Sequence, residues 1–118
     1  MSRRLKRLNV LFRQELSDLV RLELRDPRLS EMVTLTRVDT SPDLTTATVY
    51  VSVMGPEEEK ANTLAALNHA APFLRRQLTG RLRIRRTPDI HFEPDQSMEE
   101  AARVLDLMKH LPHGQPEA

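Results

Sequence analysis

The sequence predicts an α+β domain in which a three-stranded sheet carries helices on one face. Two observations predict this class: apolar residues recur every three or four positions in some stretches and every second position in others. The expected order is helix, strand, strand, kinked helix, strand and short helix. At 118 residues the chain can bury one core, so we expect a single domain over residues 1–110 and a flexible tail over residues 111–118.

The first expected element is an amphipathic helix that begins near Leu5 and ends near Arg25. Its apolar side chains recur at three- and four-residue steps, which places them on one stripe. Asp26 precedes Pro27, and a residue before proline avoids helical angles, so the helix should stop there. The stripe consists of Leu5, Leu8, Phe12, Leu16 and Leu19.

Three strands are expected after this helix. Val33–Val38 is rich in β-branched residues, and Ala47–Val53 alternates apolar with polar side chains. The segment Thr40–Leu44 between them has turn chemistry, so these two strands should pair antiparallel. A third, shorter strand is expected over Asp89–Glu93.

The second expected helix begins at Glu57, and its apolar period runs through Pro72. A proline inside a helix removes one hydrogen bond and clashes with the carbonyl four residues earlier, here that of Asn68. The helix should therefore kink, and the kink residues are Ala70, Ala71 and Pro72. Gly80 is expected to end the helix as its C′ glycine.

The last part of the chain has two expected features. Leu82 and Ile84 alternate with arginines, which indicates extended chain with the arginines pointing outward. Ser97 and Glu100 have the spacing of a capping box, so a final helix should begin there. Its apolar residues are Ala101, Leu105 and Met108.

Basic residues are concentrated in two segments. Residues 1–13 and 75–86 hold 11 of the 18 lysines and arginines and no acidic residue, although the formal net charge of the chain is only +1. Cations at a helix start oppose the helix dipole, which favours a binding role for them over a stabilising one. Such segregation is typical of nucleic-acid binders, although solvated charge runs are the alternative. The candidate RNA-binding residues are Arg3, Arg4, Lys6, Arg7, Arg75, Arg76, Arg81, Arg83, Arg85 and Arg86.

No catalytic or metal-binding constellation stands out. The four histidines are scattered, cysteine is absent, and the three glycines are too isolated for a phosphate-binding loop. We therefore expect no enzyme activity, no cofactor and no metal. With no signal-peptide core and no apolar run of about 18 residues, we expect a cytoplasmic protein that does not span a membrane.

The kind of nucleic acid is suggested by the small number of aromatic residues. Three phenylalanines, one tyrosine and no tryptophan leave little surface on which unpaired bases could stack. Arginine contacts to phosphates and sugar edges of folded RNA fit the composition better. A DNA-binding or chromosome-associated protein and a protein-interaction scaffold remain alternatives at this point.

Several short motifs occur in one order along the chain: Asp26–Leu29, Val33–Val38, Ser41–Leu44, Ala47–Val53, Leu74–Arg76, Arg85–Pro88, Phe92 and Asp95–Ser97. Together they resemble the bacterial ribosome-binding factor A family, from about Arg4 to Leu107. The resemblance implies a type II KH-like fold in which a kinked helix pair replaces the usual Gly-x-x-Gly loop. The family's kink is typically Ala-x-Gly, and this chain differs in having Pro72 there.

The resemblance also implies a function. Members of the family are non-catalytic assembly factors that bind the small (30S) ribosomal subunit and its 16S rRNA precursor. They assist late maturation and rRNA processing. We accordingly expect the small subunit and its rRNA as partners, no small-molecule substrate, and a monomeric protein.

Overall fold

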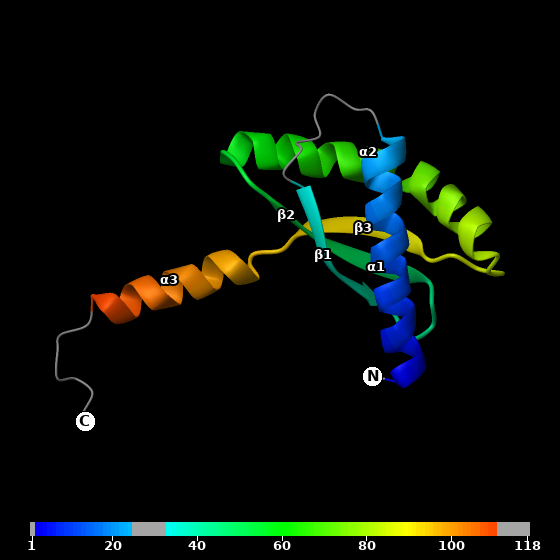
Figure 1. Ribbon diagram of the computed structural model, residues 1–118, viewed down its shortest axis with the longest axis horizontal. Helices are drawn as coiled ribbons and strands as arrows, with labels where there is room; N and C mark the ends of the chain where they lie inside the picture. The colour runs from blue at the N-terminus through cyan, green and yellow to red at the C-terminus, as the bar shows by residue number, and fades with distance from the viewer. Residues whose placement is uncertain (1, 25–32, 111–118) are drawn as a thin grey trace.

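In the part of the chain that the structure describes, the fold contains three helices and one sheet of three strands (Figure 1). The computed structural model describes residues 2–24 and 33–110. The expected turn at residues 26–29 and the expected tail at residues 111–118 lie outside the described residues. The elements are α1 (Arg3–Glu23), β1 (Val33–Thr40), β2 (Thr46–Val53), α2 (Glu57–Leu82), β3 (Asp89–Pro94) and α3 (Ser97–Lys109). The predicted class and order of elements are thus confirmed.

The strands lie in the order β1-β2-β3, with β1 antiparallel to β2 and β2 parallel to β3. Strand residues alternate between the two faces of a sheet, and one face here carries the buried side chains. It packs with α1 and α2, whereas the other face carries half-buried and exposed polar residues such as Arg37, Tyr50 and His91. The buried strand residues are Leu35, Val38, Thr40, Ala47, Val49, Val51, Ile90 and Phe92.

The core joins both long helices to this face of the sheet. Helix α1 contributes Phe12, Leu16 and Leu19, which lie on the stripe predicted from the sequence. Helix α2 contributes Leu67, and the later turns of the same helix contribute Leu74 and Leu78. All three side chains are fully buried. Burying one such side chain stabilises the fold by roughly 1.5–3 kcal/mol, so these stripes determine how the helices dock.

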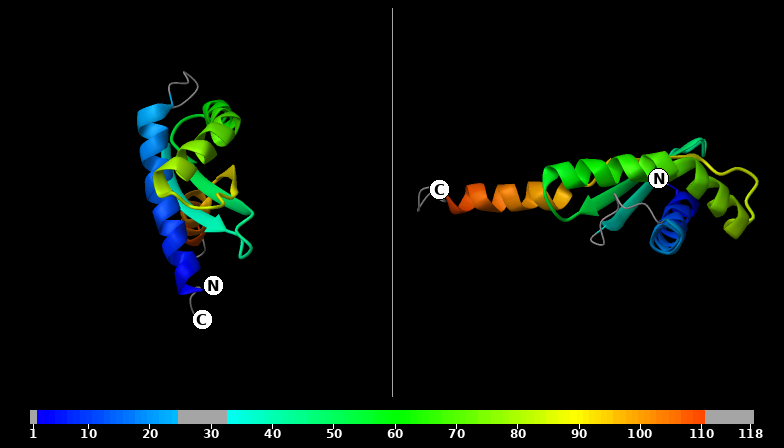
Figure 2. Two further views of the ribbon diagram at one scale, coloured as in Figure 1. Left: turned by 90° about the vertical axis from the view of Figure 1, so that its right-hand side faces the viewer. Right: turned by 90° about the horizontal axis from the view of Figure 1, so that it is seen from above.

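Helix α2 is 26 residues long and includes Pro72 (Figures 1 and 2 show its ribbon changing direction between its two halves). It continues past Gly80, so the prediction that this glycine ends the helix is wrong. The left-handed position is instead taken by Arg83, with φ 51° and ψ 41°, whose N–H donates to the Thr79 carbonyl. The longer helix places Leu82 against the core, so Leu82 belongs to the last helical turn and not to extended chain. That burial offsets the cost of about 1 kcal/mol for a glycine inside a helix.

Helix α3 differs from the other two because it projects away from the sheet (Figure 1). Its described side chains, at residue 97 and residues 100–109, are all exposed. The expected capping box is wrong: Gln96 occupies the N-cap without a side-chain cap, and Ser97 is the first helical residue. The Asp95 carboxylate instead satisfies one free N–H at the start of the helix, since its Oδ1 accepts the Ser97 N–H at 2.9 Å. In the described part of the chain, no helix is both long and apolar enough to cross a membrane.

Candidate nucleic-acid interface

Two basic segments that are far apart in the sequence lie around one hollow of about 510 Å³. Arg4 and Arg7 reach it from the first turns of α1, and Arg85 and Arg86 reach it from the segment between α2 and β3. We call this site the basic hollow. Its apolar lining consists of Leu8, Leu11, Phe12, Leu44, Ile84 and Pro88.

The basic hollow has a strongly positive rim. Among the described residues, its lining contains four arginines and no acidic residue, and all four arginine side chains are exposed. Within residues 2–24 and 33–110, none of the four forms an ion pair, so their donors can meet a ligand. The start of α1 adds to the positive potential, because its first turn carries no carboxylate and the helix dipole is positive at this end.

A second hollow of about 570 Å³ lies along α2 and β3, where α2 contains Pro72. We call it the kink groove. Arg75 and Arg76 line it together with Ala71 and the exposed Pro72, whereas Ala70 packs against the core. Four of the predicted basic and kink positions therefore share one groove with the edge of β3. The β3 residues in its lining are Asp89, Ile90 and His91.

Two of the predicted arginines have partners within the protein. Arg75 donates through Nε to the Thr87 carbonyl at 2.9 Å and lies 3.5 Å from Asp89 Oδ1. Arg81 Nη1 lies 3.3 Å from Glu15 Oε1 and so links α2 to α1. These two side chains help to hold the framework, which leaves less of their charge for a ligand. Three further residues of the predicted RNA-binding set are exposed but lie outside both hollows: Arg3, Lys6 and Arg83.

The loop between β1 and β2 adds a wall that the sequence did not indicate. Leu44 lines the basic hollow and has a φ of 60°, in the left-handed region. The loop is held by Asp43, whose Oδ1 accepts hydrogen bonds from Ser41 Oγ and from the N–H and hydroxyl of Thr45. These bonds, that of Ser41 first, lower the pKa of Asp43. Turn chemistry was visible in the sequence, but the direction of Leu44 depends on how the folded loop meets α1.

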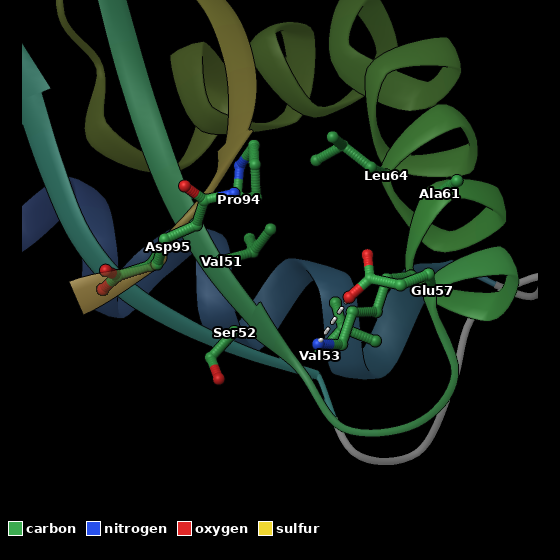
Figure 3. A pocket seen from close by; sticks show the side chains of 10 residues that line it. Val51, Ser52, Val53, Glu57, Ala61, Leu64, Pro94 and Asp95 are labelled. Atoms are coloured by element: carbon green, nitrogen blue, oxygen red, sulfur yellow. Dashed lines mark hydrogen bonds and ion pairs between the residues drawn. The ribbon is translucent and has the colours of Figure 1, made fainter. Parts of the chain in front are cut away.

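A third hollow has a different character. It lies between the ends of β2 and β3 and the start of α2 (Figure 3). Glu57 and Asp95 line it alongside Lys60, which lies 3.5 Å from Glu57. This mixed charge and the apolar walls at Val51 and Val53 set it apart from the basic hollow.

The histidine and acidic side chains of the described residues are scattered over the fold. No three His, Asp or Glu side chains in residues 2–24 and 33–110 gather as ligands for a metal ion. His91 Nε2 lies 2.5 Å from Glu93 Oε2 on the open face of the sheet, where both side chains are largely exposed. The geometry therefore offers guanidinium donors around apolar surface, which is an arrangement for holding an anion with a hydrophobic part.

The fold and this surface define a class of protein, the small α+β domains with a KH-like arrangement of elements and one strongly basic side. Within it, the chain belongs to the ribosome-binding factor A family, whose sequence profile matches residues 4–108. The resemblance noted from the sequence motifs is thereby confirmed.

Individual relatives agree with this assignment. Ribosome-binding factor A of Acetivibrio thermocellus is 48% identical over 105 residues, which cover 89% of this chain and 85% of the relative. The crystal structure of ribosome-binding factor A from Thermus thermophilus is 32% identical, with a TM-score of 0.68 over 77% of this chain and 94% of that one. A homology model of the Thermus thermophilus factor, fitted into a cryo-EM map of a 30S complex, has a TM-score of 0.62 at 32% identity and covers 75% of this chain and 91% of that one.

Proposed function

We propose that this protein is a non-catalytic ribosome assembly factor. It binds the small ribosomal subunit and its 16S rRNA precursor and assists late maturation and rRNA processing. The observation that carries the proposal is the basic hollow, where Arg4 and Arg7 meet Arg85 and Arg86 without an acidic neighbour in the lining. Family membership and the 30S complex of the Thermus thermophilus factor support the small subunit as the partner.

The protein would act by holding one arrangement of the rRNA. Its basic side chains contact phosphates, and such contacts fix position and orientation without reading sequence. A binding protein shifts a folding equilibrium only by its differential affinity for one conformation, so the factor favours the rRNA arrangement that fits its surface. The same differential affinity requires release once the subunit matures.

The remaining features of the proposal concern the state in which the protein works. The factor acts as a monomer in the cytoplasm, on a macromolecular partner and not on a small substrate. Residues 1–110 form the one functional domain. Of the kink residues, Ala71 and Pro72 line the kink groove, whereas Ala70 packs against the core beside them. Arg75 and Arg76 line the same groove and add further phosphate contacts.

The test is charge reversal in the basic hollow, with Arg4, Arg7, Arg85 and Arg86 all changed to Glu. We expect this variant to lose co-sedimentation with immature small subunits, while the parent protein retains it. If the parent protein contacts six to ten phosphates, its affinity should fall by a factor of about 10³–10⁵ when the salt concentration rises from roughly 50 to 200 mM. Arg103→Glu on the exposed α3 is the matched control for the single variant Arg86→Glu and should bind normally. Unchanged binding of the fourfold variant, or equal affinity of the parent for duplex DNA, would overturn the proposal.

A further inference from the structure

We propose that the basic hollow receives the base of one unpaired RNA nucleotide, while the arginines on its rim bind the flanking phosphates. This inference rests on the proposed function, because it specifies what that surface binds. A site for phosphates alone would need only exposed cations. The basic hollow has, in addition, an apolar floor and a volume of about 510 Å³.

The floor is the first observation. Leu11 is 39% exposed although it lies among four arginines, whereas Phe12 beside it in the lining is 1% exposed. Leu8 and Ile84 are half-buried in the same lining. When a flat ring covers apolar surface that was exposed to water, binding becomes more favourable by about 25 cal/mol for each Å² of apolar surface that is buried.

The rim is the second observation. Arg4 and Arg7 are three residues apart on α1 and so share one side of that helix. Arg85 and Arg86 join them from the segment between α2 and β3. A guanidinium can donate to phosphate oxygens and can also stack on the face of a base, so the same side chains serve both parts of a nucleotide.

The size of the site fits this occupant. The hollow of about 510 Å³ falls within the range of roughly 300–1,000 Å³ that is typical of small-ligand sites. A fully paired RNA helix keeps its bases stacked inside, so it would touch the rim and leave the floor in water. An unpaired nucleotide can place its base on the floor and its phosphates on the rim at once.

This proposal differs from an expectation drawn from composition. Few aromatic residues argued against the binding of unpaired bases. Here the stacking surface would come instead from guanidinium planes and from aliphatic side chains such as Leu11, Leu44 and Ile84. The site accommodates one base, which is compatible with an otherwise folded RNA partner.

The experiment compares two RNA hairpins of equal stem sequence, one fully paired and one with a single bulged nucleotide. Their affinities for the full chain are measured by fluorescence anisotropy at one salt concentration. We expect the bulged hairpin to bind at least about fivefold more tightly, since stacking one base on a protein surface contributes measurably to affinity. A third hairpin with an abasic bulge should bind like the paired one.

Two variants separate base insertion from charge. Leu11→Lys removes floor and adds a cation, so a purely electrostatic site would bind both hairpins more tightly, whereas base insertion predicts loss of the preference. Leu22→Lys, at the other end of α1 where the side chain is 59% exposed, makes the same charge change and should keep the preference. Leu44→Asn offers a second test that does not depend on Leu11, because asparagine tolerates the left-handed backbone at φ 60°.

The outcomes distinguish this inference from the proposed function. If the parent protein binds small subunits but binds all hairpins equally, base insertion is wrong and the proposed function stands. The same holds if Leu11→Lys and Leu44→Asn both fold and retain the preference. If the parent protein does not bind small subunits at all, the proposed function itself fails.

Discussion

Asn68 of α2 pairs with the backbone of Phe92 in β3 through both atoms of its side-chain amide. Its Oδ1 accepts the Phe92 N–H at 2.8 Å, and its Nδ2 donates to the Phe92 carbonyl at 3.1 Å. Strand β3 lies at the edge of the sheet, so this amide takes the place of a missing neighbouring strand. Pro72 has no N–H to donate to the Asn68 carbonyl four residues earlier. The helical turn that lacks this hydrogen bond is therefore also the turn that attaches α2 to β3.

We expect Asn68→Ala to lower the free energy of unfolding by about 1–3 kcal/mol, because it leaves the Phe92 N–H and carbonyl without this partner. Urea unfolding followed by circular dichroism measures the change. Asn62→Ala is the matched control, since Asn62 is an exposed asparagine of the same helix. A loss no larger than in Asn62→Ala would mean that water replaces the amide at little cost.

Pro72→Ala should raise the free energy of unfolding by about 1–2 kcal/mol. The exchange restores an N–H inside α2 and removes a penalty of roughly 3 kcal/mol, part of which is offset by the greater freedom of alanine in the unfolded chain. The buried residues Leu67 and Leu74 anchor the helix before and after Pro72, so we expect the bend to persist.

The comparison for Pro72 is Pro72→Gly, which should gain about 1 kcal/mol less than the alanine variant because glycine is a poorer helix former. Binding to small subunits, measured by co-sedimentation, should change by less than about twofold in both variants if packing holds the bend. A large loss of binding in Pro72→Ala alone would show that the proline itself sets the direction of Arg75 and Arg76.

The core was predictable because its signals are local. Spacings of three and four located Phe12, Leu16 and Leu19, and strict alternation located Val49 and Val51. Either pattern fixes which side of an element is apolar. Which sides of the helices and the sheet contact each other then follows, because their apolar sides are buried against one another.

The ends of the elements were less predictable, since tertiary contacts decide them. Glycine is a common residue just after a helix end, yet packing of Leu82 extends α2 past Gly80, and Arg83 takes the left-handed position. The basic segments were visible as charge, but their meeting around one hollow depends on the path of the chain after α2. Leu44, an ordinary loop leucine in the sequence, enters that hollow through a backbone angle that no local pattern predicts.

Thr40→Val should leave the protein as stable or make it more stable by up to about 1 kcal/mol. The Thr40 hydroxyl is buried and has no hydrogen-bond partner among the described residues, so valine of similar shape removes an unpaired polar atom. Asn9→Leu should do the opposite, because Asn9 Oδ1 accepts the buried Thr40 N–H at 3.0 Å. In thermal unfolding, the Tm should be unchanged or higher for Thr40→Val and lower for Asn9→Leu; a lower Tm for Thr40→Val would contradict the assignment of its hydroxyl as unpaired.

Asp95 connects three elements at the root of α3. The Thr36 hydroxyl donates to its Oδ2, and Thr36 lies at the irregularity between Leu35 and Arg37 in the pairing of β1 with β2. The Asp95 N–H donates to the Val51 carbonyl at 2.7 Å. The side-chain bond from Thr36, followed by those from Ser97, lowers the pKa of Asp95 from 3.8 to about 2.

This lowered pKa predicts how stability depends on pH. A carboxyl group whose pKa is lower in the folded state contributes stability that is fully present above its unfolded pKa, here 3.8, and is lost as the pH falls towards about 2. Asp95→Asn should therefore cost about 1 kcal/mol at pH 7, a value kept small because solvent reaches the group. The difference between the variant and the parent should shrink between about pH 4 and pH 2. Glu100→Gln on the exposed α3 makes the same carboxylate-to-amide exchange at an exposed position, and in urea unfolding at about pH 7 it should cost less than Asp95→Asn. If the cost of Asp95→Asn stays constant down to about pH 2, the charge of Asp95 does not hold the root of α3.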